Sequence, residues 1–282
     1  MKTVLEVLQA TSGYFEKHSV ENPRLNAEHL LGHVLGRKRL ELYMEFDRPL
    51  SELELEPLRD FVRRRARGEP LQHLLGTAEF FGRSFLCDKR ALIPRPETEQ
   101  LVERVLAEKA GTNGSRLRVL DVGCGSGVIA LTLAAEWPAA EVQAFDISPD
   151  ALALSRENAA RLHLSERVAF FESDLLGAAN GFYDFIIANL PYIPRIEIFE
   201  LAKEVRFDPR LALDGGPDGF DLLNRLAIEA KNFLHHGGTI AFEVGHDQAT
   251  TLIDKLSTEG YHGIRAFPDY QGLQRFVIAH HG

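Results

Sequence analysis

The sequence predicts an α/β protein in which a parallel sheet with an antiparallel last strand follows a small helical domain. Three observations predict this fold. From residue 116 onward, short apolar runs alternate with amphipathic segments, which is typical of a parallel sheet covered on both faces by helices. Before residue 72 the apolar spacing is helical and no strand pattern appears. The last two apolar runs are joined by so short a connection that they must pair antiparallel.

Composition limits the classes of function. The chain has 282 residues, of which 45% are hydrophobic, enough for one large domain and a smaller one. Its net charge of -9 argues against a protein that mainly grips long nucleic acid, because phosphate binding depends on clustered Lys and Arg. A small polar ligand or a protein partner fits better. We expect no stable nucleic-acid partner and a monomeric protein.

Cysteine usage and hydropathy predict the compartment. The two cysteines, Cys87 and Cys124, form neither a disulfide framework nor a close pair, as expected of a reduced cytoplasmic protein. The N-terminus lacks a basic flank followed by an apolar segment, and no apolar run approaches the roughly 20 residues that span a bilayer. We therefore expect a cytoplasmic protein without a membrane segment.

Residues 1–75 are expected to form an N-terminal helical domain that docks a substrate. Asn22 and Pro23 suit the N-cap and first position of a second helix, and Ser51 with Glu54 matches a capping box that opens a later one. The apolar faces of the expected helices are formed by Leu5, Leu8, Phe15, Leu30, Leu31, Val34, Leu35, Leu55, Leu58, Phe61 and Val62.

Two polar features of this region allow a functional and a structural interpretation. His29 and His33 share one helix face, but the sequence suggests no third ligand, so we expect no metal site. The arginine-rich run 63–67 lies near a helix C-terminus, where cations are favoured, in a region with equal numbers of acidic and basic residues. A solvated helix end is favoured for this run, and a docking patch for a partner is the alternative.

Residues 76–94 are expected to connect the two domains. The aromatic-rich stretch from Ala78 to Phe85 predicts a tight β-hairpin. The segment Leu92–Glu99 then turns into a helix, with Pro96 near its first turn.

The domain from 95 to 282 carries the alternating pattern. We expect strands near residues 117–122, 140–146, 167–171, 183–188 and 238–244, with helices near 127–137, 149–162, 219–235 and 247–259. The final strands are expected at 260–267 and 274–279.

A glycine-rich turn follows the first strand of this domain. The strand reaches Asp121 and Val122, and the turn that follows is Gly123-Cys124-Gly125-Ser126-Gly127. Glycines let the backbone turn sharply and approach a ligand, and a helix N-terminus favours a carboxylate or phosphate. The spacing is GxGxG, so the GxGxxG dinucleotide pattern is not met.

Two acidic positions strengthen the prediction of a ligand site. Asp146 ends the second strand about 20 residues on, where a carboxylate can accept both hydroxyls of a ribose. Asp174 with Leu175 follows the third strand, where an adenine amino group could be met. Each aspartate alone would more often be a cap or turn residue. The ordered set predicts a nucleoside ligand at the carboxyl ends of the strands.

This arrangement resembles the class I S-adenosylmethionine-dependent methyltransferases, over residues of about 95–282. The resemblance implies a Rossmann-like fold and S-adenosyl-L-methionine as cofactor. It also implies that Gly123, Gly125 and Gly127 face the methionine part, that Asp146 meets the ribose, and that Asp174 with Leu175 meets the adenine. Cys124, Ser126 and Asn189 complete the expected cofactor site.

The acceptor half of the site is expected at Asn189-Leu190-Pro191-Tyr192, after the fourth strand. A planar amide or aromatic amine is a poor nucleophile because its nitrogen lone pair is delocalised. The Asn189 side-chain oxygen and the Leu190 carbonyl can accept both N–H bonds of such a group and aim its lone pair at a methyl sulfonium, while Tyr192 can stack on it. An ordinary turn after a strand is the alternative. Amino-methylating enzymes share an NPPY pattern, from which Leu190 departs.

Nearly the whole chain resembles the PrmC/HemK family of release factor glutamine methyltransferases. The resemblance rests on the helical N-terminal region, the acceptor tetrapeptide, and the stretches LIPRPETE (92–99), VRFDPRLAL (205–213) and GGPDG (215–219), with Asp269 and Arg275 near the end. It implies methylation of the side-chain amide of the glutamine in the Gly-Gly-Gln motif of class I peptide chain release factors.

The sequence also allows two other functions. One is a methyltransferase that acts on the exocyclic amine of a base in DNA or RNA, and the other is a nucleoside-binding module without turnover. Glu243 and Arg206 could reach the rim of the site or anchor loops, and the second interpretation is favoured.

Overall fold

A computed structural model describes residues 1–108 and 116–282 of the chain. The chain forms two compact units: the first comprises Met1–Thr77 with Ala202–Phe207, and the second comprises Ala78–Leu201 with Asp208–Gly282. In the described ranges, the helices are all too short or too polar to cross a membrane.

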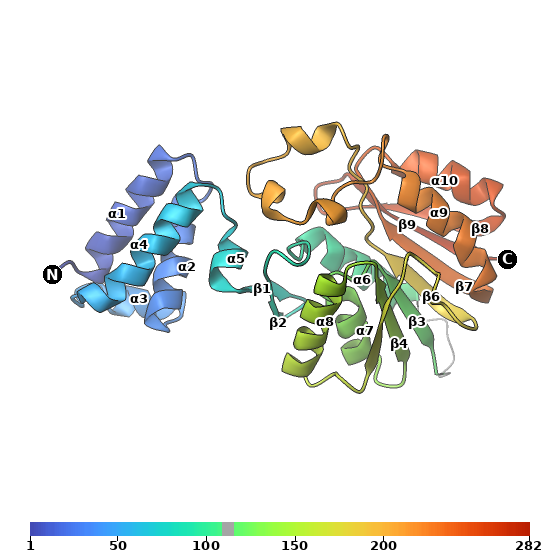
Figure 1. Cartoon of the computed structure of the whole chain (residues 1–282), viewed down its shortest axis with the longest axis horizontal. Helices are drawn as coiled ribbons and strands as arrows, with labels where there is room; N and C mark the ends of the chain where they lie inside the picture. Colours follow the sequence, from blue (N-terminus) through green and yellow to red (C-terminus); the bar gives the residue numbers. More distant parts are fainter. Residues whose placement is uncertain (109–115) are drawn as a thin grey trace. The chain divides into compact units, whose positions relative to one another are not determined.

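The first unit is helical (Figure 1). Its helices are α1 (Val4–Lys17), α2 (Pro23–Leu35), α3 (Arg39–Met44), α4 (Glu52–Ala66) and α5 (Leu71–Leu75). The expected capping box of α4 is confirmed, because the Ser51 hydroxyl accepts from the Glu54 N–H and the Glu54 carboxylate accepts from the Ser51 N–H. The expected side-chain cap of α2 is wrong. Asn22 occupies the N-cap position but adopts a left-handed backbone with φ of 47°, and its side chain makes no cap bond.

The arginine run has one buried member. Arg65 is 3% exposed; it donates from Nε to Asn26 Oδ1 over 2.7 Å and forms an ion pair with Glu204. The expectation of a solvated helix end is therefore wrong for Arg65, because its charge is neutralised inside this unit. The neighbouring Arg63 is exposed.

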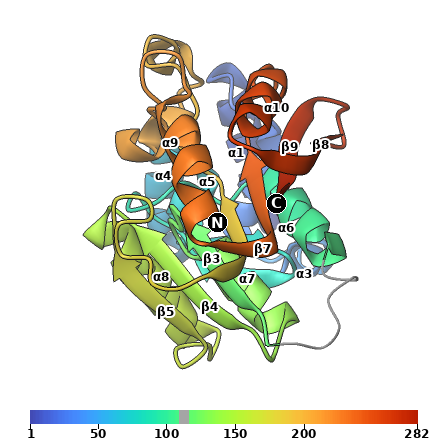
Figure 2. The same cartoon turned by 90° about the vertical axis from the view of Figure 1, so that its right-hand side faces the viewer.

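The second unit contains a seven-stranded sheet with the strand order β5-β4-β3-β6-β7-β9-β8 (Figures 1 and 2). The strands are β3 (Arg118–Val122), β4 (Glu141–Asp146), β5 (Val168–Glu172), β6 (Tyr183–Ala188), β7 (Leu234–Glu243), β8 (Tyr261–Pro268) and β9 (Gln274–His281). The first five in sequence run parallel, and β9 pairs antiparallel with both β7 and β8. The predicted sheet and its antiparallel end are confirmed.

Helices cover both faces of this sheet (Figure 2). One apolar cluster includes α6 (Pro96–Glu108), α7 (Val128–Glu136) and α8 (Pro149–Arg161), and the other includes α9 (Asp221–Glu229) and α10 (Ala249–Thr258). Strand residues alternate between the two clusters, as the two-residue period of a strand requires.

The chain between α9 and β7 departs from the expected helix 219–235. The α-helix ends at Glu229, a 3₁₀ turn follows at Ala230–Asn232, and β7 begins at Leu234. The apolar residues Phe233 and Leu234 continue the helical spacing in sequence, but Leu234 pairs with Tyr183 of β6. Pairing with the neighbouring strand overrides the local pattern.

The predicted hairpin is present as β1 (Thr77–Phe80) and β2 (Arg83–Leu86). Its two turn residues, Phe81 and Gly82, have φ of 49° and 71°, which matches the twist of a two-residue hairpin. Three 3₁₀ turns that the apolar pattern does not predict follow β6, at Glu197–Glu200, Val205–Phe207 and Arg210–Ala212.

Candidate active site

A cavity lies in the second unit, where the parallel strands end. Ten of the twelve residues predicted for the site line it: Gly123, Cys124, Gly125, Ser126, Asp146, Asp174, Leu175, Asn189, Leu190 and Pro191. Gly127 and Tyr192 adjoin these residues in sequence. The cavity is also lined by the segment from Arg90 to Arg95 and by Thr98.

The glycine turn is held tightly after β3. The N–H groups of Gly123 and Cys124 both donate to the Phe145 carbonyl, over 2.8 and 2.9 Å. Gly127 has φ of 83°, and a Cβ there would lie 2.9 Å from the Cβ of Ser155 on α8. Close packing of the turn against α8 therefore requires glycine at this position.

Asp146 supports the glycine turn as well as lining the cavity. Its Oδ2 accepts from the Gly125 N–H over 2.8 Å, and its Oδ1 accepts from the Ser148 N–H over 2.8 Å. Burial raises the pKa of this carboxyl above its ordinary value, against the lowering effect of these backbone hydrogen bonds. The carboxylate retains lone pairs that could meet a ligand hydroxyl.

Asp121 is a buried carboxyl beneath the turn, for which the sequence suggested no separate role. Its Oδ2 accepts from the Ala130 N–H over 3.0 Å, which satisfies one of the free donors of the first turn of α7. Its Oδ1 has no hydrogen-bond partner in the described part of the chain. Burial raises the pKa of Asp121 to about 7.

Asp174 and Leu175 differ in environment. Asp174 is exposed, and its Oδ2 lies 3.1 Å from a guanidinium nitrogen of Arg225 on α9. Leu175 is 5% exposed and adopts φ of 46°, a left-handed conformation that is uncommon for leucine. The Ser173 hydroxyl donates to the Leu175 carbonyl over 2.9 Å and holds this conformation.

The acceptor tetrapeptide begins beside the glycine turn. Val122 of β3 pairs with Ala188 of β6, so the two segments leave adjacent strands at the same level. Leu190 is 4% exposed, and its Cδ2 lies 2.8 Å from where a Cβ on Gly123 would stand. The leucine that replaces the first proline of NPPY therefore packs against the glycine turn.

The GGPDG stretch supports the acceptor turn from its other side. The Gly215 N–H donates to the Ile193 carbonyl over 2.9 Å, and a Cβ on Gly215 would lie 2.8 Å from the Pro191 carbonyl oxygen. The side chain of Gln248 donates to the Tyr192 carbonyl over 2.9 Å. The glycine lets two backbone segments approach each other more closely than a side chain would allow.

Asn189 is connected to two residues that the sequence did not assign to the site. Its Nδ2 donates to Thr98 Oγ1 over 3.0 Å, and the Thr98 hydroxyl donates to Glu243 Oε2 over 2.7 Å. Thr98 lies on α6 and lines the cavity, whereas Glu243 ends β7 and is 2% exposed. Glu243 thus contacts a residue that lines the cavity, although it does not line the cavity itself. Arg206 lies in the 3₁₀ turn that belongs to the first unit.

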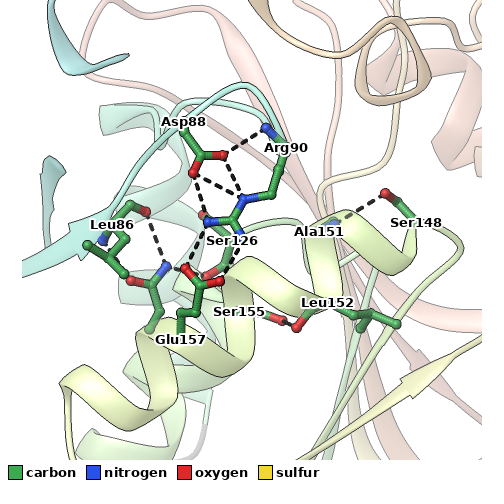
Figure 3. Close-up of polar contacts among 10 residues, drawn as sticks. Leu86, Asp88, Arg90, Ser126, Ser148, Ala151, Leu152, Ser155 and Glu157 are labelled. Atoms are coloured by element: carbon green, nitrogen blue, oxygen red, sulfur yellow. Dashed lines mark hydrogen bonds and ion pairs between the residues drawn. The ribbon is translucent and has the colours of Figure 1, made fainter. Parts of the chain in front are cut away.

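Asn158 of α8 joins the glycine turn to the hairpin. Its Nδ2 donates to the carbonyls of Ser126 and Leu86, over 3.0 and 3.2 Å, and its Oδ1 accepts from the Leu86 N–H over 2.6 Å. Figure 3 shows Leu86 and Ser126 on either side of this contact. Asn158 falls at helical spacing from the buried Ala151, Leu154 and Ser155, which was the one sequence signal that it faces inward.

Arg90, which lines the cavity, forms further contacts with α8. Its guanidinium pairs with Asp88 over 2.8 Å and with Glu157 of α8 over 2.7 Å (Figure 3). The segment that precedes α6 is thereby attached to α8 by side chains.

Two family models match the chain. The model described as the PrmC N-terminal domain matches residues 6–76, and the model of the methyltransferase small domain matches residues 98–204. Solved structures with under 25% identity show the same fold. A methyltransferase from Pyrococcus furiosus has a TM-score of 0.53 at 18% identity, over 72% of this chain and 90% of that one. The hMettl16 catalytic domain has a TM-score of 0.59 at 15% identity, over 76% and 82%.

Curated relatives match over almost their full length. The release factor glutamine methyltransferase of Chlorobaculum tepidum is 41% identical, over 97% of this chain and 95% of its own. The release factor glutamine methyltransferase of Geobacter sulfurreducens is also 41% identical, over 98% and 95%. The match includes the helical unit as well as the methyltransferase unit. The chain therefore belongs to the release factor glutamine methyltransferase family.

Proposed function

We propose that this protein transfers a methyl group from S-adenosyl-L-methionine to the side-chain amide nitrogen of the glutamine in the Gly-Gly-Gln motif of class I peptide chain release factors. One observation carries the proposal: the glycine turn and Asn189-Leu190-Pro191 line the same cavity, after two paired residues of adjacent strands. A donor and an acceptor bound to these segments are brought within reach of each other. Family membership supports the choice of the acceptor.

The residues of the cavity suit the methyl donor. Gly123, Cys124, Gly125, Ser126 and Gly127 would hold its methionine part, Asp146 its ribose, and Asp174 with Leu175 its adenine. The remaining lone pairs of the buried Asp146 fit a pair of hydroxyls, and the apolar lining fits a flat ring. When bound, the donor supplies a methyl group on a positively charged sulfur.

The acceptor segment suits a primary amide. Asn189 Oδ1 and the Leu190 carbonyl would accept the two N–H bonds of the glutamine side chain and so hold its nitrogen lone pair toward the methyl group. A carbon–nitrogen bond forms as the carbon–sulfur bond breaks, and the nitrogen then releases a proton to solvent. Tyr192 would stack on the amide as a neutral phenol, because burial raises the pKa of its hydroxyl.

The helical unit favours a protein substrate over a nucleic acid. Its family model is the N-terminal domain of this family, and the whole chain is acidic, with a net charge of -9. A nucleic-acid methyltransferase would need a basic surface to bind phosphates. We further propose that the protein acts as a cytoplasmic monomer.

The test is incubation with labelled methyl donor and purified release factor, followed by mapping of the labelled residue. We expect label on the glutamine of the Gly-Gly-Gln motif, and none on a control release factor in which this glutamine is replaced by glutamate. Total nucleic acid serves as the competing substrate. Label on the nucleic acid and none on the glutamine would contradict the proposal.

A further inference from the structure

The Asn189 side chain can serve the acceptor in only one of its two orientations. Its amide has an oxygen that accepts and a nitrogen that donates. With Oδ1 toward the cavity, Asn189 can accept an N–H of a primary amide. With Nδ2 toward the cavity, its own N–H groups would face the N–H groups of the substrate amide, and no hydrogen bond could form. Whatever fixes this orientation therefore controls how the acceptor is held.

Two side chains fix it from outside the acceptor segment. Thr98 Oγ1 accepts from Asn189 Nδ2 over 3.0 Å and donates to Glu243 Oε2 over 2.7 Å. Thr98 is 3% exposed and Glu243 is 2% exposed, so water does not substitute for either partner. In the described part of the chain, no residue donates a hydrogen bond to Asn189 Oδ1.

The direction of these bonds depends on the charge of Glu243. An ionised carboxylate can only accept, so the Thr98 hydroxyl must donate to it, and the free lone pair of Thr98 must then receive Asn189 Nδ2. A protonated Glu243 can donate to Thr98, which frees the hydroxyl to donate to Asn189 Oδ1 and allows the reversed amide. The charge on the Glu243 carboxyl thus sets the orientation of the Asn189 amide, to which it is linked through the Thr98 hydroxyl.

The surroundings of Glu243 bring its pKa close to neutral pH, where the ionised and the protonated carboxyl are both populated. Burial is the largest effect and, with the nearby Glu97 of α6, raises the pKa of Glu243 to about 7, while Thr98, Arg275 of β9 and Asn189 lower it. Arg275 is shared with Asp269, whose Oδ2 lies 3.2 Å from its Nε. Tyr192 also faces this group as a neutral phenol.

We propose that Thr98 and Glu243 are positioning residues, which hold Asn189 with Oδ1 toward the acceptor amide when Glu243 is ionised. This inference rests on the proposed function, because it takes a primary amide as the acceptor. Neither residue is proposed to touch the methyl group or the amide nitrogen that accepts it. Their effect should appear in turnover rather than in binding of the methyl donor.

The test compares Thr98→Val with Thr98→Ser in the full-length protein. Valine keeps the shape and removes the hydroxyl, while serine keeps the hydroxyl. We expect Thr98→Val to lower kcat on release factor by about 10- to 100-fold, and to change KM and the Kd of the methyl donor less than about threefold. Thr98→Ser should stay within about threefold of the unmodified protein.

Thr132→Val is a matched control. Thr132 is also fully buried, on α7, and its hydroxyl has no hydrogen-bond partner among the described residues. The same chemical change there should leave kcat within about twofold.

The pH profile gives a second readout that a merely structural role would not move. In the unmodified protein, kcat/KM, which reports ionisations of the free enzyme, should rise with pH through an apparent pKa of about 7, as Glu243 ionises. Glu243→Gln should lower kcat and remove this rise. Burial also raises the pKa of Asp121 to about 7, so the Glu243→Gln variant is needed to assign the rise to Glu243. If that variant fails to fold, the comparison of Thr98→Val with Thr98→Ser still tests the inference.

Three results would overturn the inference: an unchanged kcat in Thr98→Val, equal losses in Thr98→Val and Thr98→Ser, or a rise with pH that persists in Glu243→Gln. Failure of the proposed function looks different. In that case the unmodified protein would not label the glutamine at all.

Discussion

At the scale of single residues, Asn189 uses its two amide atoms for different purposes. Its nitrogen is bound to Thr98 inside the protein, and its oxygen is proposed to face the acceptor in the cavity that Asn189 lines. Leu190 contributes in two ways as well, because its carbonyl is proposed to face the acceptor while its side chain packs beside Gly123. In the proposed function, acceptor binding depends on side chains and backbone that the protein holds in place before the substrate arrives.

Replacing Asn189 with alanine should separate turnover from donor binding. The variant loses the oxygen that accepts one N–H of the substrate amide, so we expect kcat to fall by at least about 100-fold. The Kd of the methyl donor, measured by calorimetry, should change less than about threefold. Asn232→Ala, at an exposed position, is the control and should behave as the unmodified protein does. Equal losses of turnover and donor binding would show that Asn189 belongs to the donor half of the site.

At the scale of elements, α8 supports the glycine turn that is proposed to bind the methyl donor. It packs closely against Gly127, and through Asn158 it binds both the glycine turn and β2. A helix that lies beneath a binding loop and is hydrogen-bonded to it keeps the loop in one conformation. The proposed donor site is therefore supported by three segments of the second unit, which are the glycine turn, α8 and β2.

Replacing Asn158 with leucine should loosen this assembly. The change leaves the Leu86 N–H and two backbone carbonyls without their partner, which should lower the free energy of unfolding by about 2–3 kcal/mol. It should also weaken donor binding. Glu157→Leu on the same helix is the control, and its half-exposed ion pair with Arg90 should be worth less than about 1 kcal/mol. Chemical denaturation of both variants measures the free energy of unfolding. Similar losses in the two variants would show that the hydrogen bonds of Asn158 stabilise the protein no more than a surface ion pair does.

At the scale of the whole molecule, the chain order and the structural units differ. The segment Ala202–Phe207 follows the acceptor turn in sequence but belongs to the helical unit. Its Glu204 pairs with the buried Arg65 of α4. The helical unit therefore includes a segment that lies between β6 and α9 in the sequence.

Replacing Arg65 with methionine should destabilise the helical unit. Methionine fills much of the same space but leaves Asn26 Oδ1 and Glu204 without their partner, so we expect a loss of about 2 kcal/mol. Arg63→Met, on the same helix and exposed, should change the free energy of unfolding by less than about 0.5 kcal/mol. Thermal unfolding followed by circular dichroism compares the two. Equal midpoints would mean that Arg65 is no more important than a surface arginine.

The sequence predicted what depends on local pattern. Apolar runs placed the strands within a few residues, and the glycine turn, Asp146 and Asn189 were recognised because each ends or directly follows a strand. Thr98, Asn158 and Arg65 were missed in their structural roles. The partners of these buried polar residues lie 145, 72 and 139 positions away in the chain, so no local spacing reveals them.

The contact between Leu190 and Gly123 limits how this enzyme can be re-engineered. A chimaera that received the NPPY turn of another amino-methylating enzyme would carry a proline ring where the leucine side chain now fills the space beside the glycine turn. The gap left behind would cost packing energy in the donor site, although no donor residue had been exchanged. The glycine turn and the acceptor tetrapeptide should therefore be exchanged together in a chimaera.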